Sequence, residues 1–315
     1  MLVEYRNLGS SGLKVSVVGL GCNNFGMKCD AEQTTAVVHR ALDEGITLFD
    51  TADIYGNRGG SEELLGKALG NRRRDVVVAT KFGMAMGEGP YLRGASRRYI
   101  VSAAEGSLRR LGTDYIDLYQ VHAPDPDTPA HETLEALTDL VRAGKVRYIG
   151  CSNFAAWQIA DAAWLSRTRG LAPYVSAQNQ YNLLDRRIER ELFPACREFG
   201  LGILPYFPLA SGFLTGKYKR GAEAPAGSRL ALMQRMADQV MTDANFVTLE
   251  RLENFASSRG HTILELAVGW LASQSLISSV ISGATTPEQV SANVRAAAWK
   301  LSAEEMRQVD ELTRR

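Results

Sequence analysis

Eight short apolar segments recur along the 315-residue chain, and their regular spacing is the feature that most constrains the fold. Through the seventh segment they begin about 30 residues apart, which is the length of one strand–helix unit. Most are apolar on successive residues, as strands buried on both faces are. We therefore predict eight parallel strands, at residues 15–21, 47–52, 76–83, 116–123, 146–153, 174–182, 202–209 and 279–285.

Helical patterns fill the spaces between these segments. In the first of them Asp30 is placed as N-cap with Gln33 at the capping-box position, and the pattern ends at Gly45. The second is expected to open at Ser61, with acidic residues in its first turn. The last interval is longer and begins with a polar, Gly- and Ala-rich segment near 210–245. The predicted helices occupy 30–45, 61–70, 97–112, 129–145, 248–259 and 263–276.

Strands alternating with helices favour a (β/α)8 barrel over its rival, the doubly wound sheet. A doubly wound sheet usually carries a GxGxxG turn after its first strand. This chain has "GLGCNNFG" there, with Asn24 where the third glycine belongs. We predict an α/β fold in which a TIM barrel forms one domain over residues 1–315.

The composition excludes several classes of function. Hydrophobic residues make up 45% of the chain and charged residues 23%, as in ordinary globular proteins. The formal net charge of +1 gives no support to nucleic-acid binding. We find no signal peptide and no apolar run long enough for a membrane span, so we expect no membrane partner and a cytoplasmic protein. The four cysteines form no CxxC pair and the four histidines no HExxH, so we expect reduced thiols and no metal. The basic turn "NRRRD" at 71–75 is interpreted as solvated surface.

Polar side chains stand at the ends of several predicted strands: Asp50, Lys81 and His122 follow the second, third and fourth. In a barrel of this kind the chemistry lies at the C-terminal ends of the strands, so these side chains should meet at one mouth. Each has an ordinary explanation when taken alone. Lys81, however, follows the buried run "VVVAT" and needs a partner, because an unpaired buried ammonium is costly. Asp50, one strand away, is the nearest candidate.

At this point the sequence resembles the aldo-keto reductase superfamily, including its potassium-channel β-subunit-like branch. The resemblance covers almost the whole chain and implies a (β/α)8 barrel with extra C-terminal helices. The segment "EYRNLGSSGLKVS" resembles the family's hairpin, which closes the barrel floor. The matching motifs, in order, are "GLGCNNFG", "FDTADIYG", "SEELLGKAL", "ATKFG", "RLGTDYIDLYQVH", "GKVRYIGCSNF", "QNQYNLL", "PYFPLASGFLTGKY" and "SGATTPEQVSANV".

The resemblance implies a catalytic tetrad of Asp50, Tyr55, Lys81 and His122. In that reading Tyr55 is the general acid that protonates a carbonyl oxygen as hydride reaches the carbon. Lys81 lowers the pKa of the Tyr55 phenol, Asp50 holds Lys81, and His122 orients the substrate oxygen. No metal is needed, because a nicotinamide cofactor supplies the hydride.

The resemblance also assigns a cofactor site. Ser152, Asn153 and Gln178 match the positions that hold the nicotinamide carboxamide, and Tyr206 matches the aromatic that stacks on its ring. Other positions match those lining the rest of the dinucleotide. The full set is Cys22, Asn23, Asp50, Ser152, Asn153, Gln178, Tyr206, Phe207, Pro208, Leu209, Ser211, Lys217, Arg229, Gly283, Thr285, Gln289 and Asn293.

The choice between NADPH and NADH is less determined. Many family members carry Arg or Lys where Thr285 and Thr286 stand here, whereas Arg229 matches a basic position of relatives with a longer loop. We expect NADPH, with NADH possible. The resemblance implies an enzyme that reduces small-molecule aldehydes or ketones. Oxidation of a sugar or alcohol with NAD and a cofactor-binding regulatory subunit remain alternatives. The oligomeric state stays open.

The substrate itself is not specified by the sequence. Loops bound the substrate site in a barrel of this kind. We expect Asn23, Phe25, Met84 and Met86 to border it, with the 210–245 segment as a lid.

Overall fold

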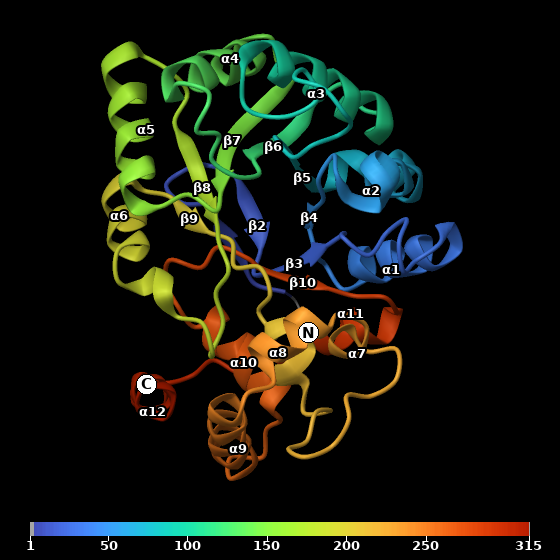
Figure 1. The fold of residues 1–315 in the computed structure, drawn as a ribbon, viewed down its shortest axis with the longest axis vertical. Coiled ribbons are helices and arrows are strands. Elements are labelled where there is room, and N and C mark those ends of the chain that lie inside the picture. Colours follow the sequence, from blue (N-terminus) through green and yellow to red (C-terminus); the bar gives the residue numbers. More distant parts are fainter. Residues whose placement is uncertain (1–2, 315) are drawn as a thin grey trace.

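Eight parallel strands form the sheet in the computed structural model, which describes residues 3–314, and this confirms the predicted barrel (Figure 1). The strands pair in the order β10-β3-β4-β5-β6-β7-β8-β9. Backbone hydrogen bonds from Ser278 to Ile203 (3.0 Å) and from Ile281 to Pro205 (3.1 Å) bring the two ends of the sheet together. The bounds are β3 Val18–Gly21, β4 Leu48–Asp50, β5 Val77–Phe82, β6 Ile116–Val121, β7 Val146–Ser152, β8 Tyr174–Gln178, β9 Gly202–Ile203 and β10 Val280–Gly283.

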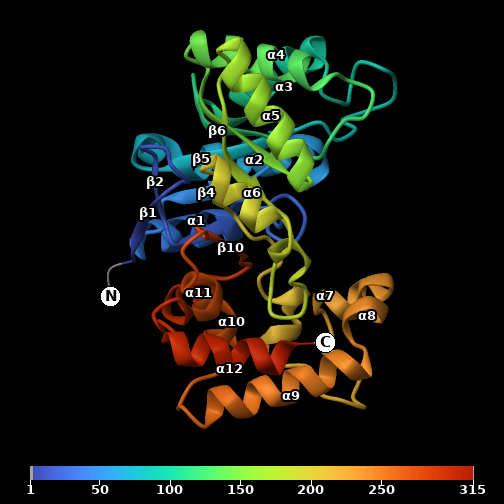
Figure 2. The same cartoon turned by 90° about the vertical axis from the view of Figure 1, so that its left-hand side faces the viewer.

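A two-stranded hairpin precedes the barrel, as the family resemblance implied. It pairs β1 (Tyr5–Asn7) with β2 (Lys14–Ser16) in antiparallel register (Figure 2). Leu8 and Val15 are fully buried and pack with Leu48, Leu118, Leu204 and Ile281 in one apolar cluster. The cluster draws its members from β4, β6, β10 and the end of β9, so the hairpin side chains close the floor of the barrel.

Helices surround the strands, and most begin and end where the sequence indicates. α1 (Ala31–Asp43) starts with the expected capping box between Asp30 and Gln33. The helix after β5 ends at Gly112, which adopts the left-handed conformation typical of a C-terminal glycine. No helix within residues 3–314 has the length and apolar character that crossing a membrane requires. The other barrel helices are α2 Tyr55–Leu69, α3 Arg97–Leu111, α4 Ala130–Arg142, α5 Ala156–Arg169, α6 Leu192–Phe199, α10 Ile263–Ala272 and α11 Pro287–Ala296.

The beginning of α2 differs from the prediction. The element starts at Tyr55, but residues 56–59 adopt positive φ angles, so the regular helix begins after Gly59, close to its predicted opening. Ser61 therefore lies inside the element instead of capping it. Its hydroxyl is buried, donates to the carbonyl oxygen of Cys22 (2.8 Å) and pairs with the hydroxyl of Thr51 (2.8 Å). Ser61 fastens the helix to β3 and β4, a tertiary role that helix-start patterns do not encode.

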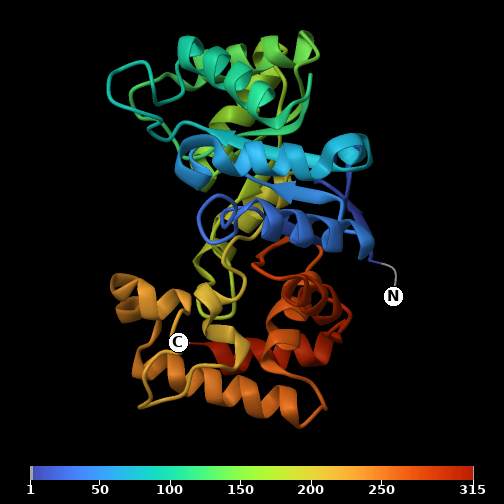
Figure 3. The same cartoon turned by 90° about the vertical axis from the view of Figure 1, so that its right-hand side faces the viewer.

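The segment expected to be a polar loop at 210–245 contains short helical elements. They are η3 (Ala210–Thr215), α7 (Arg229–Leu232) and α8 (Gln234–Val240), and α9 (Asp243–Ser257) begins earlier than predicted. The side chains of Ser228 and Thr242 cap α7 and α9. α9 and the C-terminal α12 (Ala303–Thr313) lie together below the barrel (Figure 3), and they are the expected extra helices.

The basic turn at 71–75 was predicted to be solvated surface, which is wrong for its central arginine. Arg73 is 8% exposed and pairs with the carboxylate of Asp117 at 2.8 Å. Its guanidinium also donates to the carbonyl oxygen of Tyr115 (2.9 Å) and lies over that ring. Arg74, the next residue, is exposed. Because Asp117 lies 44 residues beyond Arg73 in the sequence and meets it only in the folded protein, local patterns miss this pairing.

We expect Arg73→Met to lower the free energy of unfolding by about 3 kcal/mol, because it leaves the buried Asp117 carboxylate without its closest cation. Arg74→Met is the matched control and should stay within about 0.5 kcal/mol of the wild type. Urea unfolding of the three proteins measures both. Equal stability of the two variants would show that the Arg73–Asp117 pair contributes nothing net.

Candidate active site

A cleft of about 1030 Å³ opens at the C-terminal ends of the strands. It joins three of the four predicted catalytic side chains to every predicted cofactor position. Lys81 is fully buried, and it is not on the cleft wall. The wall includes Cys22, Asn23, Asp50, Tyr55, His122, Ser152, Asn153, Gln178, Tyr206, Phe207, Pro208, Leu209, Ser211, Lys217, Arg229, Gly283, Thr285, Gln289 and Asn293.

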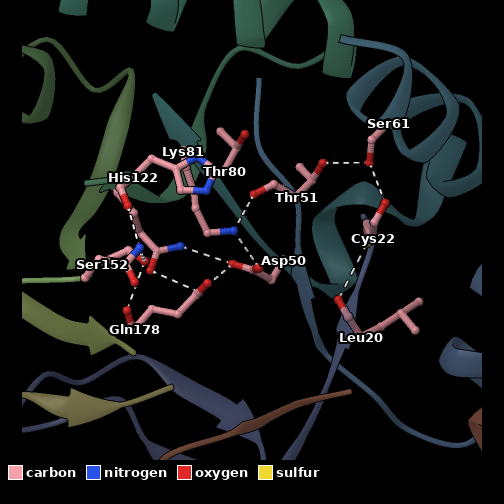
Figure 4. Close-up of polar contacts among 12 residues, drawn as sticks. Leu20, Cys22, Asp50, Thr51, Ser61, Thr80, Lys81, His122, Ser152 and Gln178 are labelled. Carbon is pink, nitrogen blue, oxygen red and sulfur yellow. Dashed lines mark hydrogen bonds and ion pairs between the residues drawn. The ribbon is translucent and has the colours of Figure 1, made fainter. Parts of the chain in front are cut away.

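A buried ion pair lies at the bottom of this cleft (Figure 4). The Nζ atom of Lys81, on β5, is 2.6 Å from Oδ2 of Asp50, the last residue of β4, and 2.9 Å from the carbonyl oxygen of Thr51. Burial acts to lower the pKa of Lys81, but the Asp50 carboxylate and the Tyr55 phenol raise it above its ordinary value. Lys81 is therefore an ammonium, and Asp50 is the partner that the sequence required.

The second carboxylate oxygen of Asp50 is also bonded. Oδ1 accepts from the side-chain amides of Gln178 (2.8 Å) and Gln120 (3.1 Å). The Gln178 amide, which the resemblance directs to the cofactor, is thus directed at Asp50 here, on the cleft wall (Figure 4). Sequence reasoning missed Gln120. The signal was available, because side chains alternate along a strand and Gln120 lies two residues before His122.

Tyr55 stands beside both Lys81 and His122. The Lys81 ammonium lies 5.0 Å from the centre of its ring, and the His122 ring meets it edge-on at 5.6 Å between centroids. Burial raises the pKa of Tyr55, and the Lys81 ammonium opposes that rise without reversing it. The expectation of a lowered Tyr55 pKa is therefore wrong. The phenol keeps its proton at neutral pH, as a proton donor must.

His122 is uncharged in this environment. Burial, and then the nearby Lys81 ammonium, lower the pKa of His122 to about 3. Its Nδ1 atom is buried and has no hydrogen-bond partner among the described residues. A neutral imidazole carries one N–H donor and one acceptor nitrogen, so His122 can hydrogen-bond an oxygen placed in the cleft without adding charge.

A chain of hydrogen bonds fixes the wall next to this group. Ser152 donates to the backbone carbonyl of Gln178 (2.9 Å), and the Asn153 amide donates to the backbone carbonyl of His122 (2.9 Å). The Tyr206 hydroxyl donates to Oδ1 of Asn153 (2.8 Å). Asn153 and Phe207 have positive φ angles, which L-residues avoid. Backbone strain of this kind is concentrated at functional sites.

The other end of the cleft is rich in positive charge. Lys28, Lys217 and Arg229 all line it. Burial, followed by repulsion from Arg229 and Lys217, lowers the pKa of Lys28. α11 begins close by, and Thr286 caps it. Cations that repel one another beside a helix N-terminus suit an anionic ligand. Sequence reasoning named Lys217 and Arg229 but missed Lys28, whose loop gives no local sign of where it turns.

Arg229 also bridges the two sides of the cleft. Its guanidinium donates to Oδ1 of Asn24 at 3.4 Å, and the Asn24 amide donates to the carbonyl oxygen of Ala284 (3.3 Å). Asn24 belongs to the loop after β3, Ala284 to the loop after β10, and Arg229 to α7. The 210–245 segment therefore contacts the loop after β3 at this end of the cleft, and its role as a lid stays a prediction.

The residues expected to border a substrate are divided by the structure. Asn23 lines the cleft, but Phe25 is fully buried in the apolar core, so its assignment to the substrate site is wrong. Met84 is 43% exposed and Met86 is partly buried against the main core, and neither lines the cleft. Phe25 follows the cleft residue Asn24 in sequence, but its own side chain packs in the apolar core.

The fold agrees with comparisons to known proteins. The Aldo/keto reductase family model matches residues 17–314, and the chain belongs to that family. It is 39% identical to a probable voltage-gated potassium channel subunit beta of Oryza sativa subsp. japonica, over 93% of this chain and 91% of the relative. It is 38% identical to an uncharacterized oxidoreductase of Bacillus subtilis (98% and 96%). It is 34% identical to L-glyceraldehyde 3-phosphate reductase of Escherichia coli K12 (98% and 92%). These matches support an oxidoreductase.

Asp53 is a further titratable group, two residues before Tyr55 in sequence and not on the cleft wall. Asp53 is fully buried and accepts a hydrogen bond of 3.4 Å from the Tyr99 hydroxyl. Burial, and then the neighbouring Glu62 carboxylate, raise the pKa of Asp53 to about 7. Folding therefore favours the protonated form of Asp53. Between about pH 4 and 7 the folded protein holds a proton that the unfolded chain has already released.

We expect the wild type to lose stability relative to Asp53→Asn by about 1.4 kcal/mol per pH unit between pH 5 and about pH 7, and the difference to level off above that. The sign follows because only the folded protein binds this proton between the unfolded and folded pKa values of Asp53, so the stabilisation is full below the unfolded value and is lost as the pH rises to the folded value. Urea unfolding of both proteins from pH 5 to 8 gives the difference, in which other titrating groups cancel. A difference that is constant over this range would show that Asp53 does not titrate there.

Proposed function

We propose that this protein is an NADPH-dependent reductase of aldehydes or ketones, with Tyr55 as the proton donor. The observation that supports this proposal most is the convergence of Tyr55, Lys81, Asp50 and His122 at one end of the cleft. An acid that keeps its proton stands beside a neutral hydrogen-bonding imidazole, above a paired ammonium. That arrangement serves proton transfer to a carbonyl oxygen.

The cleft fits a dinucleotide in size and in its donors. Its volume of about 1030 Å³ extends from the Tyr55 end to α11, and its far end carries Lys28, Lys217, Arg229 and the helix N-terminus. Those groups would hold the phosphates, and Ser152, Asn153 and Tyr206 would hold the nicotinamide end. A bound nicotinamide supplies the hydride. Because the cations cluster on one side of the adenosine end, we favour NADPH over NADH.

Each of the four side chains then has a role. Tyr55 gives its proton to the carbonyl oxygen, and His122 donates a hydrogen bond that orients the same oxygen. Lys81 stabilises the phenolate that forms when Tyr55 gives up its proton, because an ammonium 5.0 Å from the ring favours the charged form of the phenol. Asp50 keeps Lys81 charged and in place, held itself by Gln178 and Gln120. The same groups in reverse would oxidise an alcohol.

A second candidate function is a channel-associated subunit, favoured by the likeness to the probable potassium channel β subunit. The complete set of four side chains favours an enzyme, since a protein that only bound a cofactor would not need it. The two candidates differ in one measurement. Purified protein incubated with NADPH or NADH and a panel of aldehydes, ketones and sugars should consume the cofactor, as followed by nicotinamide absorbance. No turnover with any carbonyl would leave the binding role.

We expect Tyr55→Phe to reduce kcat for carbonyl reduction by roughly 10²- to 10⁴-fold, because it removes the donated proton. Binding of NADP⁺, measured by protein fluorescence, should stay within about twofold of the wild type, since the ring and its packing remain. Tyr91→Phe is the matched control, because Tyr91 is 58% exposed and outside the cleft. Activity of Tyr55→Phe within about twofold of the wild type would assign the proton to another group.

We expect Arg229→Ala and Lys28→Ala each to lower the ratio of kcat/KM for NADPH to that for NADH by about tenfold or more, because a charge-assisted contact to the extra phosphate contributes about 1.5–3 kcal/mol. Arg220→Ala is the control: Arg220 belongs to the same segment but pairs with Glu250 away from the cleft. Direct Kd values for NADP⁺ and NAD⁺ separate binding from turnover. If both variants keep the wild-type ratio, the 2′-phosphate is held elsewhere.

A further inference from the structure

A left-handed turn directly follows Tyr55. Gly56, Asn57 and Arg58 have φ angles of 64°, 60° and 66°, and Gly59 has a φ of 121°. Two of these four residues carry side chains, and L-residues are disfavoured in that conformation, above all in succession. The turn therefore needs support from the surrounding structure. Gly56 is required in it, since a Cβ there would lie 2.5 Å from the backbone of both Phe25 and Ser61.

The side chain of Arg110, on α3, covers this turn from outside. A Cβ on Gly59 would overlap the Cδ atom of Arg110, so the aliphatic part of the arginine rests directly on the glycine. Gly106 leaves room for the guanidinium, because a Cβ there would be 3.0 Å from one of its nitrogens. Two glycines, one in the turn and one on α3, thus make the space that Arg110 fills.

The guanidinium of Arg110 is fixed by a buried carboxylate. Its Nε donates to Oε2 of Glu62 at 2.7 Å, and Glu62 is fully buried. The other Glu62 oxygen accepts from the Thr80 hydroxyl at 2.5 Å. Thr80 directly precedes Lys81 on β5. One carboxylate therefore connects α3, the helix that follows the turn, and the strand that carries Lys81.

We propose that Arg110 is a positioning residue for Tyr55: packed on Gly59 and paired with Glu62, it holds the left-handed turn and so fixes the Tyr55 side chain against Lys81. This inference rests on the proposed reductase function. Without Arg110, the Glu62 carboxylate would be buried with only a hydroxyl as partner, and the turn would be free to relax. Tyr55 precedes the turn by one residue and would move with it.

The test compares Arg110→Met with Arg109→Met, which removes the same charge from the exposed neighbour on α3. Hydrogen exchange monitors the turn through three bonded amides: Asp53 to Lys81 O, Tyr55 to Ala52 O and Arg58 to Ile54 O. We expect these amides to exchange at least about tenfold faster in Arg110→Met and as in wild type in Arg109→Met. We also expect kcat to fall by roughly 10- to 100-fold, with the Kd for NADP⁺ within about twofold.

Unchanged exchange at these amides in a folded Arg110→Met protein would overturn the proposal, and so would faster exchange with kcat within about twofold of the wild type. If Arg110→Met does not fold, Gly59→Ala replaces it, with Gly70→Ala as control. Gly70 also has a positive φ but has no atom near its Cβ position, so it carries the strain without the contact. The exchange measurement needs no substrate. It therefore still decides whether Arg110 holds the turn if the wild type reduces no carbonyl.

Discussion

The buried pair of Lys81 and Asp50 is the interaction on which the candidate site depends. An ammonium with no exposed surface is tolerated only when its desolvation is offset by an ion pair and further hydrogen bonds. Here the offset comes from Asp50 at 2.6 Å and the carbonyl oxygen of Thr51. Both partners come from the end of β4, directly beside β5 in the sheet. The register of two neighbouring strands thus decides whether this charge can exist inside the protein.

The pair also sets the state of its neighbours. The Lys81 ammonium adds to burial in keeping His122 neutral, and it opposes burial at Tyr55. The same fixed charge therefore lowers the pKa of both groups, whereas burial lowers the pKa of His122 and raises that of Tyr55. The outcome is a neutral phenol beside a neutral imidazole, above a single cation. Under the proposed function, such a site would accept a neutral carbonyl group without bringing in a further charge.

The strands and the residues at their ends were accessible from sequence because both depend on short-range patterns. Apolar runs identify the strands, and Asp50, Lys81 and His122 follow them directly. Features that depend on contacts between distant segments were not accessible. Buried Arg73 is paired with Asp117, 44 residues further along the chain, and Phe25 packs in a core cluster built from distant segments. The predicted direction of the Tyr55 pKa shift was wrong for a similar reason. The sequence can suggest a charged neighbour, but it does not show the loss of water around the phenol.

The hairpin at the barrel floor joins the two ends of the chain. Leu8 and Val15 pack with Leu204 and Ile281, and the Arg6 guanidinium donates to the carbonyl oxygens of Ala272 and Ile277. During synthesis the first of these segments leaves the ribosome well before the last. The floor of the barrel can therefore close only after Ile281 has been made, and until then Leu8 and Val15 lack part of their native contacts. In the interval between the synthesis of the hairpin and that of Ile281, the exposed apolar side chains are open to chaperones or to aggregation.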